Sequence, residues 1–246
     1  MMDYGFVVVH IPHASIFIPD EYRQTILLSD VELQNEIIAM TDAFCDELYD
    51  FPGVGDTVIA PVSRLVCDME RFRDDENEPC AKKGQGLMYT HTHDGKLLRE
   101  YDNALRENIL AEFYDPHHAR LTSAVDTALA KYGKCLIIDG HSFPDGPGMP
   151  DFDIGTDSFH TPRNLRDALC KRAGELGFSH LVNIPYSGTI TPMKHYGKDK
   201  RVMSVMIETS RKLYQQPGKF DKTPDFEKIR NVCHEVIKCA ANAGGF

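Results

Sequence analysis

Short apolar runs alternate with stretches of helical periodicity along most of the chain. The clearest run covers residues 135–138, is β-branched at its centre and is bounded by Gly133 and Gly140. Such a run is typical of a strand that is buried on both faces, as in a parallel sheet covered by helices. Similar runs at 6–9 and 203–207 predict two further central strands.

Helical patterns lie between these runs. The first begins at Ser29 or Asp30, either of which can cap a helix, and is expected to run to about Asp50. Further helices are expected at about 97–113, at 116–132, from 162 onwards and at 223–241, and shorter strands at 58–60, 65–67, within 143–162 and at 180–185. This alternation predicts a three-layer α/β/α fold with a mostly parallel or mixed sheet.

The length of the chain suits one domain. Its 246 residues are enough for one sizeable core, and we expect residues 1–246 to form a single domain. The segment at about 68–96 is polar and carries many charges. We expect it to be a long surface insertion, since long ordered loops in compact domains are often functional lids.

Charge and cysteine content narrow the class of protein. The formal net charge is −10 and no basic tract occurs, so neither nucleic acid nor an anionic membrane is an expected partner. The N-terminus shows no signal-peptide pattern, and no apolar stretch approaches the ~20 residues of a membrane span, so we expect a cytoplasmic protein. The seven cysteines are scattered without a C-x-x-C motif, so a metal site would use histidine and carboxylate.

Two histidines and one glutamate stand where the predicted strands end. His13 follows the first strand, His141 follows the 135–138 run, and Glu208 follows the 203–207 run. In open α/β sheets the ligand site lies beyond the carboxyl ends of the strands, so these side chains look like parts of one site. Catalytic zinc takes three ligands of this kind and one water. From spacing alone, a metal site and a mere capping role for the histidines are equally open.

Eight short stretches resemble the N-formylglutamate amidohydrolase family of histidine degradation, and they lie in order over most of the chain. They are IPHAS at 11–15, TDAFCDEL at 41–48, SRLVCDMER at 63–71, YDPHH at 114–118, DGHS at 139–142, NIPYSG at 183–188, HYG at 195–197 and IE at 207–208. That family is similar in fold to zinc carboxypeptidases and cell-wall amidases. The resemblance implies a single zinc site that hydrolyses an amide bond.

The resemblance also implies roles for particular residues. By motif position, His13 and His141 would be zinc ligands and Glu208 the general base. Asp42 is the preferred third ligand, because family members commonly have an aspartate pair here and Asp42 lies nearer the expected helix start than Asp46. His10 competes for this role, because zinc carboxypeptidases use H-x-x-E where this chain has H-x-x-H. The first motif departs from the family's usual His-Ser-Gly and reads His-Ala-Ser.

Four further residues are candidates for substrate binding. Arg64 and Arg71 could clamp the carboxylates of a substrate, for which the planar guanidinium is suited, or could pair with nearby acidic residues. Gly188 could let backbone amides approach a substrate oxygen, or could only serve a turn. His195 could stabilise an oxyanion or bind a carboxylate, and a surface position is equally open.

The leading hypothesis is a zinc-dependent enzyme that hydrolyses the amide of an N-formyl or other small N-acyl acidic amino acid. The most specific form of it is the conversion of N-formyl-L-glutamate to L-glutamate and formate. The alternatives are a zinc peptidase or cell-wall-type amidase on the same fold, and a non-catalytic metal-binding protein. Glu208 favours an enzyme, because a pure binder has no need of a carboxylate beside the metal. The sequence leaves the acyl group, the amino acid and the oligomeric state open.

Overall fold

The computed structural model describes residues 3–243, which form two compact units. The first unit contains residues 3–11, 44–58 and 120–243, and the second contains residues 12–43 and 59–119. The chain therefore passes from one unit to the other four times along its length. The single domain expected for residues 1–246 stays a prediction.

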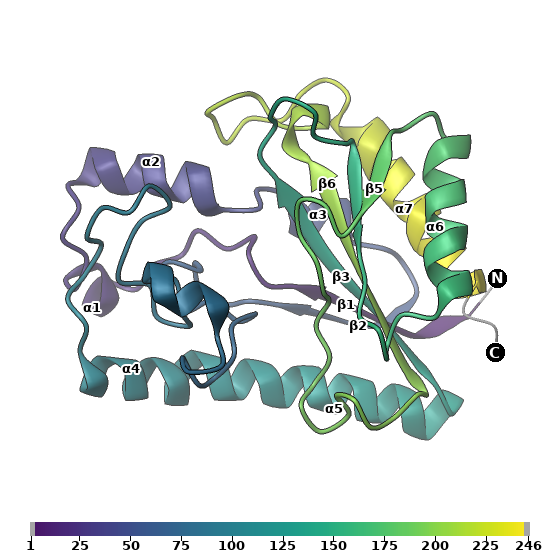
Figure 1. Ribbon diagram of the computed structural model, residues 1–246, viewed down its shortest axis with the longest axis horizontal. Helices are drawn as coiled ribbons and strands as arrows, with labels where there is room; N and C mark the ends of the chain where they lie inside the picture. The colour runs from purple at the N-terminus through teal and green to yellow at the C-terminus, as the bar shows by residue number, and fades with distance from the viewer. Residues whose placement is uncertain (1–2, 244–246) are drawn as a thin grey trace. The chain divides into compact units, whose positions relative to one another are not determined.

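A six-stranded sheet forms the centre of the first unit (Figure 1). Its strands are β1 (Tyr4–Ile11), β2 (Val54–Ile59), β3 (Cys135–Phe143), β4 (Phe152–Gly155), β5 (His180–Val182) and β6 (Val202–Ser210), in the order β2-β1-β3-β6-β4-β5. Strand β3 pairs in parallel with β1 and β6, while β4 is antiparallel to β6 and parallel to β5. The mixed α/β fold with a mostly parallel sheet is thereby confirmed.

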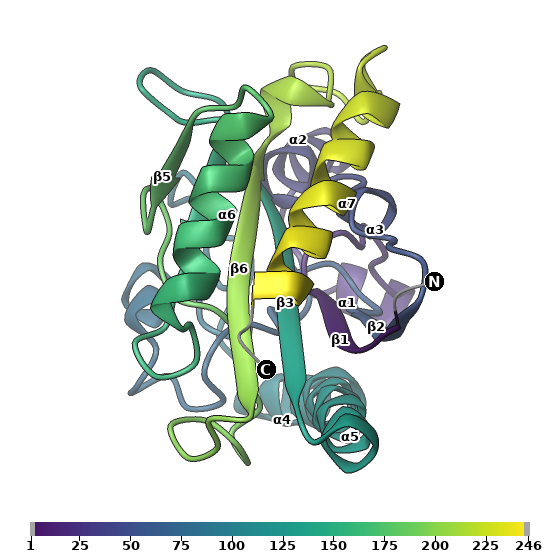
Figure 2. The same ribbon diagram turned by 90° about the vertical axis from the view of Figure 1, so that its right-hand side faces the viewer.

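Helices cover both faces of this sheet. The part of α5 (Asp115–Tyr132) that belongs to the first unit packs Leu121 and Val125 against Val8 and Ile137 on one face. The other face is covered by α3 (Cys45–Leu48), α6 (Arg163–Glu175) and α7 (Phe226–Ala243), and Figure 2 shows α6 and α7 side by side over it. Apolar residues recur every three or four positions along α7, which gives the helix one buried side.

The second unit consists of short helices and long irregular segments. Its helices are α1 (Asp20–Arg23), α2 (Asp30–Met40), the 3₁₀-helix η1 (Pro79–Lys83), α4 (Asn103–Ile109) and the π-helix η2 (Leu110–Tyr114), and the first turn of α5 follows directly. Helix α2 begins as expected, because Ser29 and Glu32 form a reciprocal capping box. Helix α4 begins later than the 97–113 pattern predicts, at the point where the Asp102 carboxylate caps the N–H groups of Ala104 and Leu105.

The long helix expected from Ser29 to about Asp50 is wrong. Helix α2 ends at Met40, Thr41 is extended, and Phe44 has a left-handed φ of 63° before α3 begins. The backbone N–H of Asp42 donates a hydrogen bond to the carbonyl of His13 at 3.0 Å, and not to a carbonyl one turn earlier in the helix. Asp42 and Asp46 therefore do not share a helix face.

The strand expected at 65–67 is also wrong. These residues form a turn, and Leu65 and Val66 are buried in two apolar clusters of the second unit. The neighbouring segment 68–96 adds Leu87 and Tyr89 to the same interior. An apolar run of three residues thus reflected burial alone, since short runs do not distinguish a strand from any other buried segment.

Candidate active site

A row of polar side chains lies on one face of the sheet in the first unit. The strand register pairs His141 with Glu208, and Glu208 with Asp153. It also pairs His10 with Asp139, which is two residues before His141 on β3. Residues paired across neighbouring strands share a face, as do residues two apart on one strand. The structure therefore brings His141 and Glu208, two of the predicted site residues, next to each other.

Asp139 is fully buried and connects two histidines to the loop of residues 183–190. Its Oδ1 lies 2.8 Å from His10 Nδ1 and 3.2 Å from His141 Nε2, and its Oδ2 accepts the Ile190 N–H at 2.9 Å. Burial raises the pKa of Asp139, but the two histidines outweigh burial and hold its pKa well below the ordinary range. An ionised carboxylate only accepts hydrogen bonds, so each histidine donates from the nitrogen that faces it.

Asp153 holds the start of the same loop. Its carboxylate accepts the backbone N–H groups of Ile184 at 3.0 Å and Tyr186 at 2.9 Å. Burial raises the pKa of Asp153. Gly188 lies between these contacts and that of Ile190, with a φ of +95° that favours glycine. The loop of residues 183–190 is thus held from the polar face of the sheet at both ends.

The backbone of β3 is supported from the opposite face by Tyr49. The buried hydroxyl of Tyr49 lies 3.0 Å from the carbonyl of His141 and 2.8 Å from that of Ile207. Gly140 makes room for this ring, because a Cβ at position 140 would stand 2.7 Å from Tyr49 Cδ2. The position of His141 therefore depends on a tyrosine and a glycine that touch neither ring nitrogen.

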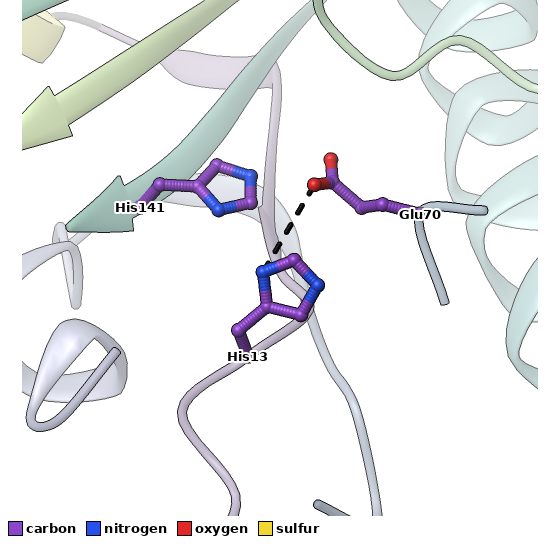
Figure 3. A group of neighbouring side chains, drawn as sticks. All are labelled: His13, Glu70 and His141. Carbon is purple, nitrogen blue, oxygen red and sulfur yellow. Dashed lines mark ion pairs between the residues drawn. The ribbon is translucent and has the colours of Figure 1, made fainter. Parts of the chain in front are cut away.

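His13 is surrounded by carboxylates in the second unit. Its Nε2 lies 2.8 Å from Asp68 Oδ1, while its Nδ1 lies 3.6 Å from Asp42 Oδ2 and 4.0 Å from Glu70 Oε2. Figure 3 draws the His13–Glu70 ion pair. Asp42 and Glu70 are thus both on the Nδ1 side of the ring, and Asp68 is on the Nε2 side.

Asp68 also bonds the two predicted substrate arginines. Its Oδ2 lies 2.8 Å from Arg64 Nη2 and 3.4 Å from Arg71 Nη2, and accepts the Tyr89 hydroxyl at 2.6 Å. Burial raises the pKa of Asp68, but Arg71, Arg64 and His13 outweigh burial and hold its pKa well below the ordinary range. The pairing with a nearby acidic residue, weighed as the alternative to a clamp, is therefore present.

His195 is held by carboxylates on both sides of its ring. Its Nε2 lies 2.9 Å from Asp126 Oδ1 of α5, and its Nδ1 lies 3.8 Å from Asp199 Oδ2. The side chain of His195 is only 8% exposed, so it is not a surface histidine.

Asp46, weighed from the sequence as an alternative to Asp42 as metal ligand, is exposed on α3 of the first unit.

Comparison with known proteins places the chain in a family. The family model of N-formylglutamate amidohydrolase matches residues 6–215. The chain belongs to the N-formylglutamate amidohydrolase family. The N-formylglutamate deformylase of Pseudomonas aeruginosa is 30% identical to it in an alignment of 234 residues that covers 85% of this chain and 85% of that protein. The resemblance predicted from the short motifs is confirmed.

Two solved structures share the fold. The N-formylglutamate amidohydrolase from Ralstonia eutropha JMP134 aligns with a TM-score of 0.84 at 21% identity, over 98% of this chain and 95% of that one. A gene product of Agrobacterium tumefaciens aligns with a TM-score of 0.75 at 21% identity, over 98% of this chain and 90% of that one.

Within residues 3–243, no helix combines the length and the apolar character needed to cross a membrane.

Sequence reasoning missed four carboxylates of this family member: Asp68, Glu70, Asp139 and Asp153. A signal was present for two of them. Asp68 and Asp139 each follow an apolar run directly, where a carboxylate has no packing role, and this is the argument that singled out Glu208. Glu70 and Asp153 do not end an apolar run, so they could be found only through their contacts.

A further group with metal-ligand side chains lies within the second unit: Glu36, His93 and Asp94, whose ligand atoms lie within 4.8 Å of one another. Both oxygens of the buried Glu36 are used by His93, one by its backbone N–H at 2.8 Å and one by its Nδ1 at 2.6 Å. Asp94 is exposed and accepts the Thr92 hydroxyl. These contacts fasten the loop at residue 93 to α2, which accounts for the group without an ion.

Proposed function

We propose that this chain is a zinc-dependent amidohydrolase that converts N-formyl-L-glutamate to L-glutamate and formate. Membership of the family and the name of the relative in Pseudomonas aeruginosa support the reaction. The observation that carries the proposal is a repeated one: His13 and His141 each bond through Nε2 to a fully buried aspartate. Metal-binding histidines usually donate their other ring N–H to such a carboxylate, which orients the ring and fixes its tautomer.

The donor set fits zinc. With Nε2 of His13 and of His141 bonded to Asp68 and Asp139, Nδ1 is the nitrogen of each ring that would bind metal. Asp42 remains the proposed third ligand, and Glu70 joins it as an alternative because both carboxylates face Nδ1 of His13. These are oxygen and nitrogen donors, as catalytic zinc sites require.

The connection along the chain supports the choice of His13. Only Pro12 separates His13 from Ile11, the last residue of β1. Strand β1 is paired with β3, which carries His141. His10, the alternative weighed from the sequence, is instead bonded through Nδ1 to Asp139.

The catalytic chemistry then divides between the ion and the protein. A bound zinc ion supplies Lewis-acid polarisation of a carbonyl and lowers the pKa of water. Glu208, beside His141 in the strand register, is proposed to accept a proton at its carboxylate and to deliver it to the departing nitrogen of the amide. Because Glu208 is 5% exposed, its carboxylate acts where little water competes.

Arg64 and Arg71 are proposed to bind the carboxylates of the substrate. Asp68 can balance one of these two guanidinium charges, and an acidic substrate would balance the other. The two side chains keep 13% and 19% of their surface exposed, so a ligand can reach them. Gly188 and His195 stay proposed substrate contacts, Gly188 because its loop is held by the row of Asp139 and Asp153.

The test combines metal analysis with a substrate panel. Protein purified without added metal should contain about one zinc per chain and should hydrolyse N-formylglutamate faster than N-acetyl amino acids or short peptides. Faster cleavage of peptides would favour the peptidase or amidase alternative. Absence of zinc, with no activity restored by divalent metals, would refute the zinc-dependent reaction. Binding of zinc with no hydrolysis of any member of the panel would favour the non-catalytic alternative.

A further inference from the structure

Asp139 lies where three parts of the first unit meet. Its Oδ1 is shared by His10 of β1 and His141 of β3, and its Oδ2 is bonded to the N–H of Ile190. The carboxylate is fully buried, and both of its oxygens are occupied by donors from different segments. One carboxylate therefore connects β1, β3 and the loop of residues 183–190.

We propose that Asp139 is a positioning residue that fixes the tautomer of His141 and links the orientation of this ring to the loop of residues 183–190. The inference rests on the proposed function, in which His141 binds metal. It goes beyond that function because it assigns one carboxylate to two tasks: the ligand atom of His141 and the placement of the Gly188 loop.

The first task follows from the chemistry of a neutral imidazole. One ring nitrogen carries the proton and the other offers the lone pair. Because Nε2 of His141 faces the Asp139 carboxylate, this nitrogen carries the proton when the ring binds metal, and the lone pair is on Nδ1. His10 donates to the same oxygen from the neighbouring strand, which keeps this oxygen between the two rings.

The second task follows from the contacts of Ile190. Its N–H is donated to Asp139 and its carbonyl accepts the Ser204 hydroxyl at 2.6 Å. Ile190 also packs against the apolar cluster under α5. Residue 190 is thus held at N–H, carbonyl and side chain, and the Asp139 carboxylate is the element that joins it to His141.

An amide at position 139 cannot perform both tasks. If the amide oxygen of Asp139→Asn faces Ile190, its NH₂ group points at the histidines, and His141 must place its proton on Nδ1. If the oxygen faces the histidines, the NH₂ group opposes the N–H of Ile190. One side of the carboxylate loses its partner in either orientation, although the shape of the side chain is kept.

The experiment measures zinc affinity by competition with a chelator for the wild type, Asp139→Asn, His141→Ala and Asp151→Asn. Loss of an outer carboxylate typically weakens metal binding by about 10–100-fold, and we expect this for Asp139→Asn. His141→Ala should weaken binding further. Asp151→Asn is the matched control, because Asp151 also accepts a backbone N–H, that of Ser179, but at the surface. Its zinc affinity should equal that of the wild type.

The outcomes separate the two proposals. If His141→Ala leaves zinc affinity unchanged, His141 is not a ligand and both the proposed site and this inference are overturned. If His141→Ala loses zinc while Asp139→Asn binds as the wild type does, only this inference is overturned.

A second measurement needs no variant at position 139, which covers the case in which Asp139→Asn fails to fold. Nitrogen-15 NMR of the histidine rings in zinc-loaded wild type, with His141→Ala for assignment, reports which nitrogen of His141 is protonated and which binds zinc. Protonation at Nε2 supports the inference, and protonation at Nδ1 overturns it.

Discussion

Asp139 in the first unit and Asp68 in the second are both fully buried, and each bonds Nε2 of one histidine. Their other partners differ. Asp139 receives a second imidazole, whereas Asp68 receives two guanidinium groups and a phenol. Each also accepts one backbone N–H, that of Ile190 and that of Glu70 respectively. The same aspartate–histidine contact therefore stands among imidazoles in one unit and beside guanidinium groups, which stay charged, in the other.

The difference assigns the two carboxylates to different parts of the proposed reaction. An imidazole can present a lone pair to a metal, so the surroundings of Asp139 suit metal binding and proton transfer at Glu208. Guanidinium groups cannot bind metal and suit an anion, so the surroundings of Asp68 suit the carboxylates of a substrate. Replacement of Asp68 should also cost more stability than replacement of Asp139. Guanidinium groups left without a carboxylate keep their charge, whereas imidazoles can lose a proton.

The largest expected effect tests the chemistry of the first unit. Glu208→Gln keeps the shape of the side chain and removes the base, so kcat should fall by about 10²–10⁴-fold while zinc content stays near that of the wild type. Metal analysis and steady-state kinetics on N-formylglutamate measure both quantities. Loss of zinc along with activity would show that Glu208 is a metal ligand. A normal zinc content together with a normal kcat would exclude Glu208 as the general base.

The next prediction compares the two aspartates directly. Asp68→Asn leaves two partly buried arginines without their carboxylate partner and should cost about 3–5 kcal/mol of the free energy of unfolding. Asp139→Asn leaves imidazole rings, which can lose a proton, and should cost less, about 1–3 kcal/mol. Urea unfolding of the metal-free proteins provides both values. Equal costs would show that the arginines do not distinguish the two sites.

A smaller effect is expected for the arginine clamp. Arg64→Ala should raise KM for N-formylglutamate by the equivalent of about 1.5–3 kcal/mol, the worth of a hydrogen bond to a charged group, and should change KM for neutral acyl-amino acids much less. Arg73→Ala is the matched control, because Arg73 pairs with Asp115 at the surface. An equal loss on acidic and neutral substrates would instead assign Arg64 to structure.

The smallest prediction concerns the backbone under His141. Gly140→Ala places a methyl group against the Tyr49 ring, and overpacking of this kind costs about 1–3 kcal/mol of the free energy of unfolding. Thermal or urea unfolding measures the cost. Tyr49→Phe in the same background keeps the ring and should not relieve it, because the close contact is with the ring carbon and not with the hydroxyl. An unchanged stability of Gly140→Ala would mean that β3 shifts freely.

Local patterns were enough for much of the fold. The strands β1, β3 and β6 were predicted from short β-branched apolar runs, and α7 from its apolar periodicity, because each signal depends only on neighbouring residues. The motif series predicted the family, which the comparison confirms. His13, His141 and Glu208 stood out because polar groups end apolar runs only where something other than packing requires them.

Tertiary structure decided the rest, because the interactions concerned are non-local. The break after Met40 has no proline or glycine to announce it, and depends on a hydrogen bond from Asp42 to His13. The partners of the two buried aspartates come from far along the chain: 129 residues separate His10 from Asp139, and 55 separate His13 from Asp68. Which carboxylate meets which histidine is set by strand register and by packing, and neither is encoded within any local stretch of sequence.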